Sequence, residues 1–224
     1  MATIGVHTRP VTTTRVRDDT WVWALAGLAL GLFGLGFVVR WQCTRGTCAL
    51  GRHEWLFDLD AIGGLPRLFT TSLFLAATVV AVRVAARSAG LRRLWWAAVS
   101  LIGVGLVFAK LVSAHSVMEG VDGRGLTLLV GTVATVVGLP LLARLGRAWG
   151  VPGARAVVLA LAVYALAALG LDQLTGLVAG LDPSPLPDAA ATFVEELGEA
   201  LAALGVLAVV VRRLPGRSRH AAER

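Results

Sequence analysis

The sequence predicts an all-α protein: a polytopic membrane helix bundle of six transmembrane helices with both chain ends on the cytoplasmic side (N-in/C-in). Hydrophobic residues make up 56% of the 224 residues and charged residues 16%, whereas soluble domains are about half apolar and one quarter charged. The mean hydropathy is +0.74. The apolar residues gather in runs of about twenty, the length that crosses a ~30 Å hydrocarbon core.

The apolar runs and the residues beside them place the six helices. Trp21 and Trp23 suit a membrane interface at the start of the first helix. Gly120 is expected to end the third helix, and Asp188 is expected to cap the sixth. Pro140 is expected to kink or end the fourth helix, since proline lacks the amide hydrogen that the helix needs. The predicted helices cover residues 21–39, 68–84, 94–119, 126–145, 156–178 and 191–211.

Polar segments divide the rest of the chain. Residues 1–20 are polar, rich in threonine and without periodicity, which predicts a disordered cytoplasmic tail. Residues 21–211 form the predicted transmembrane domain, with an outer loop at 40–67 and a proline-rich outer turn at 181–190. Residues 212–224 form a basic cytoplasmic tail.

The arginines predict the orientation. Alternating helix ends place 15 arginines on one side of the membrane and 5 on the other, while Lys110 falls within the bilayer. Basic residues concentrate on the cytoplasmic side, so we expect a multi-pass protein of the bacterial plasma (inner) membrane. The net charge of +7 does not indicate nucleic-acid binding, because the arginines flank apolar runs and form no stripe with aromatic residues.

Two cysteines lie in the predicted outer loop. Cys43 and Cys48 enclose four residues, and a disulfide between them is the expected state if the loop faces an oxidising space. The alternative is a pair of free or metal-bound thiolates assisted by His53, although one histidine beside this spacing is a weak zinc signal.

Ionisable residues inside the apolar runs are the strongest functional signal. Counting 1.5 Å per residue places Lys110, Asp172, Glu195 and Glu199 in one layer in the outer half of the bilayer. Charged groups in hydrocarbon need partners or water, so we expect Lys110 to pair with Asp172 or Glu199. The residues expected around this layer, as a second shell or an outer mouth, are His115, Glu119, Gln173 and Glu196.

Simpler explanations exist for these residues. Lys110 has a long stem that can carry its ammonium to the outer interface. The sixth helix can begin before residue 191, which would leave Glu195 and Glu196 near water and favoured by the helix dipole.

Three classes of function remain open. Transport or binding of a small solute, coupled to protons or ions, is the first, because a buried layer of acids and a lysine suits a proton relay. The second is an accessory or structural subunit, whose ion pair fixes helix register. The third is a metal-dependent intramembrane hydrolase, although no H-E-x-x-H or G-x-S-x-G motif is present. The weak candidate metal ligands are His53, His115, Glu119, Glu195 and Glu199.

Cofactors and partners follow from the same patterns. No cofactor is predicted, and a divalent metal ion is the weaker alternative. The lipid bilayer is the expected environment. Gly27 and Gly31 form a G-x-x-x-G pattern, which predicts a homodimer or a partner helix on that face of the first helix; the alternative is that glycine is simply common in membrane helices.

Overall fold

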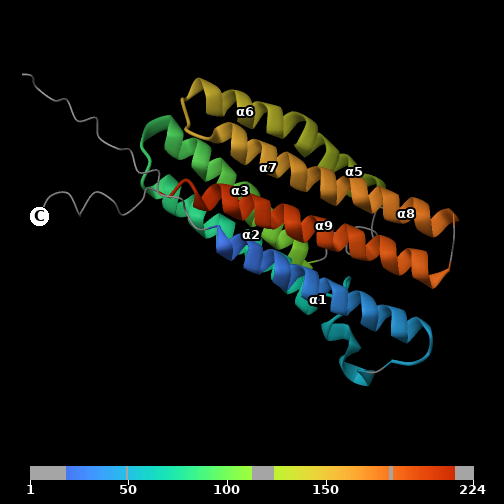
Figure 1. The fold of residues 1–224 in the computed structure, drawn as a ribbon. Coiled ribbons are helices and arrows are strands. Elements are labelled where there is room, and N and C mark those ends of the chain that lie inside the picture. Colours follow the sequence, from blue (N-terminus) through green and yellow to red (C-terminus); the bar gives the residue numbers. More distant parts are fainter. Residues whose placement is uncertain (1–18, 49, 113–123, 182–183, 215–224) are drawn as a thin grey trace, which may run out of the picture.

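A computed structural model describes residues 19–48, 50–112, 124–181 and 184–214, and these residues contain helices and no strand (Figure 1). The prediction of an all-α membrane bundle is therefore confirmed for this part of the chain. The elements are α1 (Thr20–Thr44), the 3-10 helix η1 (Gly51–Leu56), α2 (Leu65–Ala86), α3 (Gly90–Val112), α5 (Arg124–Val133), the π-helix η2 (Ala134–Gly138), α6 (Leu139–Ala148), α7 (Ala154–Leu166), the π-helix η3 (Ala167–Leu171), α8 (Asp172–Leu181) and α9 (Pro185–Val211).

Five helical stretches are long and apolar enough to cross a membrane. They are α1, α2, α3, the stretch through α5, η2 and α6, and the stretch through α7, η3 and α8. The 27 residues of α9 would span about 40 Å, but the helix contains three glutamates, Glu195, Glu196 and Glu199. The protein is therefore a membrane-embedded bundle with five spans by composition and α9 as a sixth long helix.

Several predicted helix boundaries are wrong. Helix α1 continues to Thr44, so Cys43 lies in its last turn. Helix α9 begins at Pro185, six residues before the predicted start, because proline at the first helical position is pre-organised for a helix. Ser184 is therefore its N-cap, and Asp188 lies in the first turn. The predicted end of the third helix at Gly120 lies outside the described residues.

Two helices contain a π-helical turn. The interruption predicted at Pro140 takes this form: η2 ends directly before α6, and Pro140 lies in the first turn of α6. The second turn, η3, includes Gly170 and ends immediately before Asp172. A π-turn shifts the hydrogen bonding by one residue, so each long helix is divided into two regular α-helical parts.

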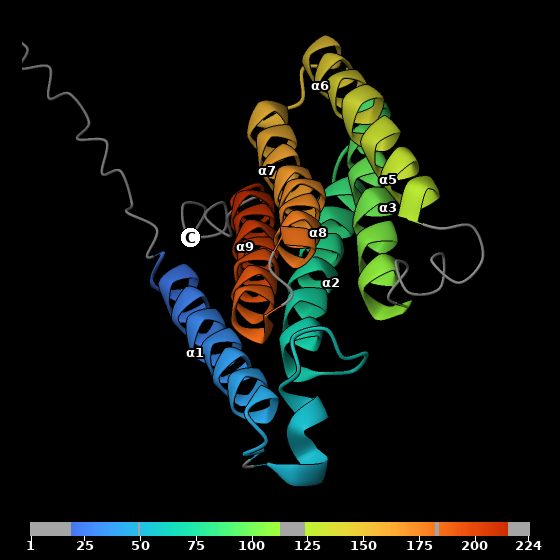
Figure 2. The ribbon, with the colours of Figure 1, turned by 90° about the vertical axis from the view of Figure 1, so that its right-hand side faces the viewer.

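Helix α9 lies in the middle of the bundle. It contacts α1 on one side and α7, η3 and α8 on the other, and it also packs on α2 (Figure 2). Helices α2 and α3 form a closely packed hairpin. The indole N–H of Trp95 on α3 donates a hydrogen bond to the carbonyl of Leu142 on α6 (2.9 Å), which joins this hairpin to α6.

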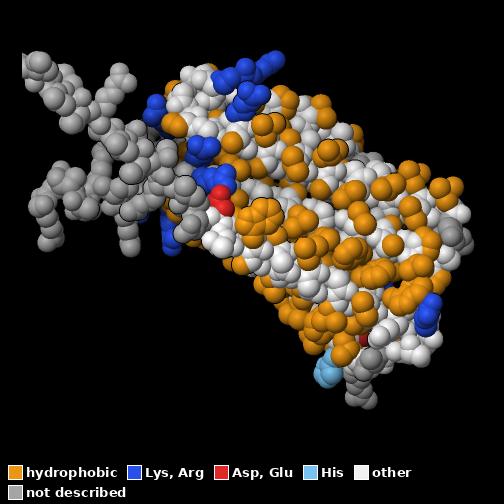
Figure 3. Space-filling model, viewed as in Figure 1, with side chains coloured by type: hydrophobic (Ala, Val, Ile, Leu, Met, Phe, Trp, Pro, Cys, Tyr) orange, Lys and Arg blue, Asp and Glu red, His pale blue; other side chains and the backbone are white. Residues whose placement is uncertain are grey.

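The surface separates apolar and basic regions. Hydrophobic side chains are spread over much of the face in Figure 3, and most of its lysine and arginine side chains gather at one end. Leu101 is 72% exposed and Leu166 is 74% exposed, as expected for side chains that face lipid. We call the arginine-rich end the basic end; its described arginines are Arg83, Arg87, Arg92, Arg93, Arg144, Arg147, Arg155, Arg212 and Arg213. The opposite end carries η1.

Candidate functional site

Four side chains from three helices form a buried cluster. Lys110 on α3 places its Nζ atom 2.6 Å from Glu199 Oε2 and 3.5 Å from Glu196 Oε2, both on α9. The hydroxyl of Tyr164 on α7 donates a hydrogen bond to the same Glu199 oxygen, at 3.1 Å. We call Lys110, Tyr164, Glu196 and Glu199 the buried cluster.

The cluster lies deep in the bundle. Glu196 is 4% exposed, Glu199 is 5% exposed, and the side chain of Lys110 is 14% exposed. Glu199 is twelve residues before Val211, which puts it about 18 Å along α9 from the basic end. The residues between them are apolar, so the charges have no polar path along α9 to that end.

Glu196 is incompletely paired. Its Oε2 atom is buried and accepts no hydrogen bond from the described residues, although it lies in ion-pair range of Lys110. Arg67 on α2 is 9% exposed and lies near enough to act electrostatically on both Glu196 and Lys110. Four helices, α2, α3, α7 and α9, therefore contribute charged or polar groups to this region.

Aromatic packing positions the Tyr164 hydroxyl. The rings of Phe74 on α2 and Tyr164 are 4.6 Å apart between centroids and lie edge to face, at 77°. Such contacts add to the apolar area that each ring buries. The hydroxyl of Tyr164 is held against Glu199 by this packing.

The structure brings only some of the predicted residues together. Lys110 lies against Glu199, which was one of its two expected partners. It also lies against Glu196, which was expected in the second shell. Residues three apart share a helix face, so Glu196 and Glu199 point to the same neighbour.

Asp172 and Glu195 lie to one side of the cluster. Asp172 accepts a hydrogen bond from the Gln173 amide at 3.2 Å, and no ion pair joins it to Lys110 in the described residues. Glu195 is half-buried and hydrogen bonded to Thr175 on α8. Of the two partners expected for Lys110, the described residues therefore show Glu199 and not Asp172, while Glu195 lies near enough to interact electrostatically with both Asp172 and Glu199.

Other site residues were missed or cannot be placed. Tyr164 was not predicted, although it is the only tyrosine of the chain and lies inside an apolar run. Arg67 was assigned to the outer loop, but it lies in the first turn of α2. His115 and Glu119 lie outside the described residues.

The cysteines form the expected pair. Cys43 and Cys48 are joined by a disulfide, and Glu54 Oε2 lies 3.1 Å from both sulfur atoms. In the described residues these three are the one group whose potential ligand atoms converge, within 4.8 Å. His53 is exposed on η1 and does not join Glu195 or Glu199 in such a group.

A second charged group lies at the η1 end. The Arg40 guanidinium contacts Asp60 and Asp188 at 2.9 Å each and Asp58 at 3.8 Å. A pocket of about 420 Å³ lies beside it, lined in part by Glu54, Asp58 and Asp60. Asp60 is near enough to act electrostatically on Glu196. Asp188, which contacts Arg40, is eight residues before Glu196, so about 12 Å along α9 separates this charged group from the buried cluster.

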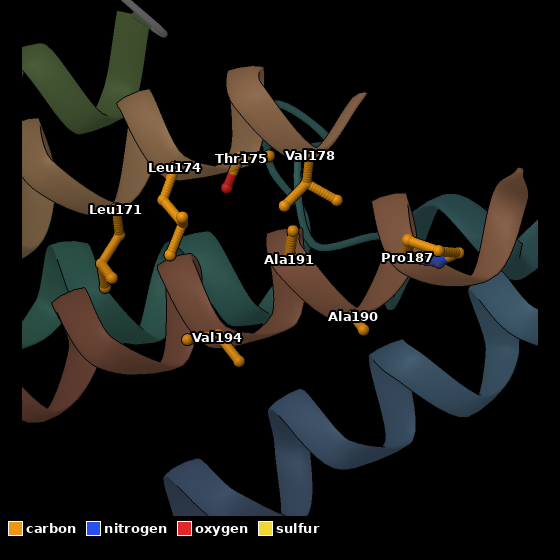
Figure 4. Close-up of a pocket in the computed structure, with 8 residues that line it drawn as sticks. All are labelled: Leu171, Leu174, Thr175, Val178, Pro187, Ala190, Ala191 and Val194. Carbon is orange, nitrogen blue, oxygen red and sulfur yellow. The ribbon is translucent and has the colours of Figure 1, made fainter. Parts of the chain in front are cut away.

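An apolar groove of about 280 Å³ lies between α8 and α9. Leu171 and Leu174 point toward α9, and Val194 lines the groove from α9 (Figure 4). Thr175 is the one polar residue of its lining, and its hydroxyl is hydrogen bonded to Glu195. The groove therefore ends beside an acidic group.

Comparisons with known proteins assign no family. No family model, curated protein or solved structure matches the chain.

Proposed function

We propose that the protein is a small membrane carrier in which the buried cluster binds a proton, and that this binding is coupled to the movement of a small solute. The observation that carries the proposal is Glu196 Oε2, a buried carboxylate oxygen without a hydrogen-bond donor among the described residues. Buried polar groups are normally hydrogen bonded, and the exceptions call for an explanation. A proton on Glu196 would neutralise a carboxylate that otherwise shares one ammonium group with Glu199.

The cluster supports proton transfer because its groups are contiguous. Tyr164 contacts Glu199, Glu199 contacts Lys110, and Lys110 contacts Glu196. The Lys110 ammonium lies between two carboxylates, so a change in the charge of either carboxylate alters how the other one pairs with Lys110. Acidic and basic side chains in such chains mark proton relays in membrane proteins.

The π-helical turns support movement near the cluster. A Cβ atom at Gly131 on α5 would lie 3.0 Å from a methyl carbon of Leu169, so α5 packs directly on η3. Such turns occur frequently at functional sites. We propose that α5 and α8 move relative to α6 and α7 at η2 and η3, and that the solute enters through the pocket beside Arg40.

We propose that the basic end faces the cytoplasm, which places η1 outside the plasma membrane. The proposed partner surface is the α1 face with Gly27 and Gly31. Both glycines are exposed, and an added Cβ atom at either would meet nothing within 4 Å. The described helices of this chain do not cover that face, which supports docking of α1 from a second copy.

The second candidate is a structural or accessory subunit. It is favoured by the short contact between Lys110 and Glu199 and by the added hydrogen bond from Tyr164, since a fully paired ion pair needs no ligand. A metal-dependent hydrolase has less support, because in the described residues the group of three converging ligand atoms includes two cysteines in a disulfide.

Proton binding separates the two leading candidates. The protein is reconstituted in liposomes that contain a pH-sensitive dye, and proton flux is driven by a potassium diffusion potential. Infrared difference spectra between two pH values report protonated carboxyl groups. We expect a carboxyl band and a proton flux in the unaltered protein, and we expect Glu196→Gln to lose both.

The control is Asp19→Asn, which removes a partly exposed carboxylate at the basic end, away from the buried cluster and from the pocket beside Arg40, and should leave both signals unchanged. Size-exclusion profiles verify that each variant is folded. A folded Glu196→Gln protein with unaltered band and flux would exclude the carrier and favour the structural subunit.

A further inference from the structure

Two arginines from distant parts of the chain meet at the turn between α6 and α7. The guanidinium of Arg213, just past α9, lies against Gly153, whose backbone has φ 75°. A Cβ atom there would collide with the guanidinium, so the contact requires glycine. The guanidinium of Arg92, from the first turn of α3, reaches Gly150, with a nitrogen 3.7 Å from where a Cβ atom would be.

Neither arginine is neutralised within the described residues. The Nε atom of Arg213 is buried and has no hydrogen-bond partner. Asp19 is the acidic residue described at the basic end, and it pairs with Arg212 at 2.6 Å. The Nε atom of Arg213 is closed to solvent, so an external acceptor would act on the uncompensated charge of the two guanidinium groups and stabilise this arrangement.

The start of α7 adds positive potential at the same turn. Gly153 is the N-cap of α7, and no side chain caps this helix end. The amides of Ala154 and Ala156 donate to the carbonyls of Val151 and Gly153, and the helix dipole at this N-terminus still favours a nearby anion. Arginine matches phosphate with a planar, two-pronged set of donors.

The surroundings point to a phosphate that carries acyl chains. Leu94 is 59% exposed one residue beyond Arg93, and Leu141 is 53% exposed on α6. The turn therefore lies where the arginines of the basic end meet the apolar belt of the bundle (Figure 3). Trp149 in the turn is half-buried, and tryptophan is enriched at membrane interfaces.

We propose that the α6–α7 turn is a binding site for the headgroup phosphate of an anionic phospholipid, held by Arg92 and Arg213. Basic pockets between membrane helices bind such headgroups. The exposed apolar side chains beside the turn receive the acyl chains. This site is separate from the buried cluster and does not depend on its role.

The test uses full-length, delipidated protein in a non-ionic detergent. Dioleoylphosphatidylglycerol and dioleoylphosphatidylcholine are titrated separately, and native mass spectrometry and thermal unfolding report binding. We expect the anionic lipid to bind more tightly and to raise the unfolding temperature. Arg92→Gln/Arg213→Gln should bind it about thirtyfold more weakly, from roughly 1 kcal/mol for each arginine.

The matched control is Arg83→Gln/Arg87→Gln, which removes the same charge from the end of α2 and should stay within about threefold of the unaltered protein. Arg92→Gln alone removes an exposed side chain and should fold, with about fivefold weaker binding. Equal binding of the two lipids, or an equal loss in the control, would overturn the site. Equal stabilisation by inorganic phosphate alone would overturn its assignment to a lipid.

Discussion

Lys110 shows how much depends on one side chain in this bundle. Its ammonium is the described cation in contact with both Glu196 and Glu199, and all three side chains are removed from water. Removing one partner of a buried ion pair costs more than the pair contributes, because the remaining charge has no compensation. The position therefore controls stability as well as any proton transfer.

Replacing Lys110 by methionine should destabilise the protein by about 3–5 kcal/mol, because two buried carboxylates lose their partner. Equilibrium unfolding in mixed micelles measures the change. Adding Glu196→Gln and Glu199→Gln to this variant should recover most of the loss. The comparison is Arg83→Met, an exposed site with an expected effect below about 0.5 kcal/mol. A Lys110→Met protein as stable as the unaltered one would contradict the burial argument.

The sequence predicted which charged residues lie at a similar depth in the membrane, but it did not predict all of the ion pairs and hydrogen bonds between them. Depth along a helix follows from residue counts, so Lys110 and Glu199 could be matched from the sequence alone. The rotation of α9 about its axis depends on packing, and it turns Glu196 toward Lys110 and Glu195 toward α8. Tyr164 and Arg67 join through contacts between distant segments, which helix periodicity does not encode.

At the scale of elements, α1 uses its glycines in two ways. Gly36 packs against the segment after η1, where a Cβ atom would lie 2.6 Å from the Phe57 carbonyl oxygen. Gly27 and Gly31 have no such neighbour. The glycines of one helix therefore serve an internal contact at one end and leave an open face at the other.

Replacing Gly31 by leucine should leave folding intact and abolish the proposed dimer, because a large side chain prevents close approach of two helices. Mass photometry or crosslinking in micelles measures the dimer fraction. Gly36→Leu is the contrasting variant. It should lower the unfolding temperature, because the added side chain would collide with the Phe57 carbonyl oxygen. An unchanged oligomeric state in Gly31→Leu would exclude this face as the interface.

Helix ends were less predictable than helices. The apolar runs identify each long helix, but α1 and α9 both continue into polar sequence that the hydropathy pattern leaves out. Residues 185–190 are rich in proline and are still helical, because Pro185 occupies the first turn, where its missing amide costs nothing. The π-turns had only Pro140 and Gly170 as signals, and neither residue specifies how the hydrogen bonds shift.

For the whole molecule, the distribution of arginine carries the proposed orientation. At the basic end, nine described arginines are accompanied by one described acidic residue, Asp19. The acidic residues of the η1 end include Glu54, Asp58, Asp60 and Asp188. The structure groups these residues at opposite ends, as the alternating helices require. The all-α class could be predicted because apolar runs of about twenty residues have one stable solution in lipid.

Topology reporters test the orientation. At the C-terminus, an alkaline phosphatase fusion should be inactive and a green fluorescent protein fusion should be fluorescent, because the basic end is expected to face the cytoplasm. The same reporters inserted between Gly46 and Thr47 should show the opposite result. An active phosphatase at the C-terminus would contradict the orientation and leave the fold unchanged.

The three glutamates of α9 also determine how the bundle can be assembled. An acidic residue at the centre of an isolated membrane helix costs roughly 2.5–3.5 kcal/mol during insertion, so α9 is poorly suited to enter lipid by itself. Helices α2, α3 and α7 precede it in the chain, and they supply Arg67, Lys110 and Tyr164. During synthesis the earlier helices can therefore supply polar partners to α9 as it inserts. The insertion of α9 should depend on Lys110, which is translated some ninety residues before Glu199.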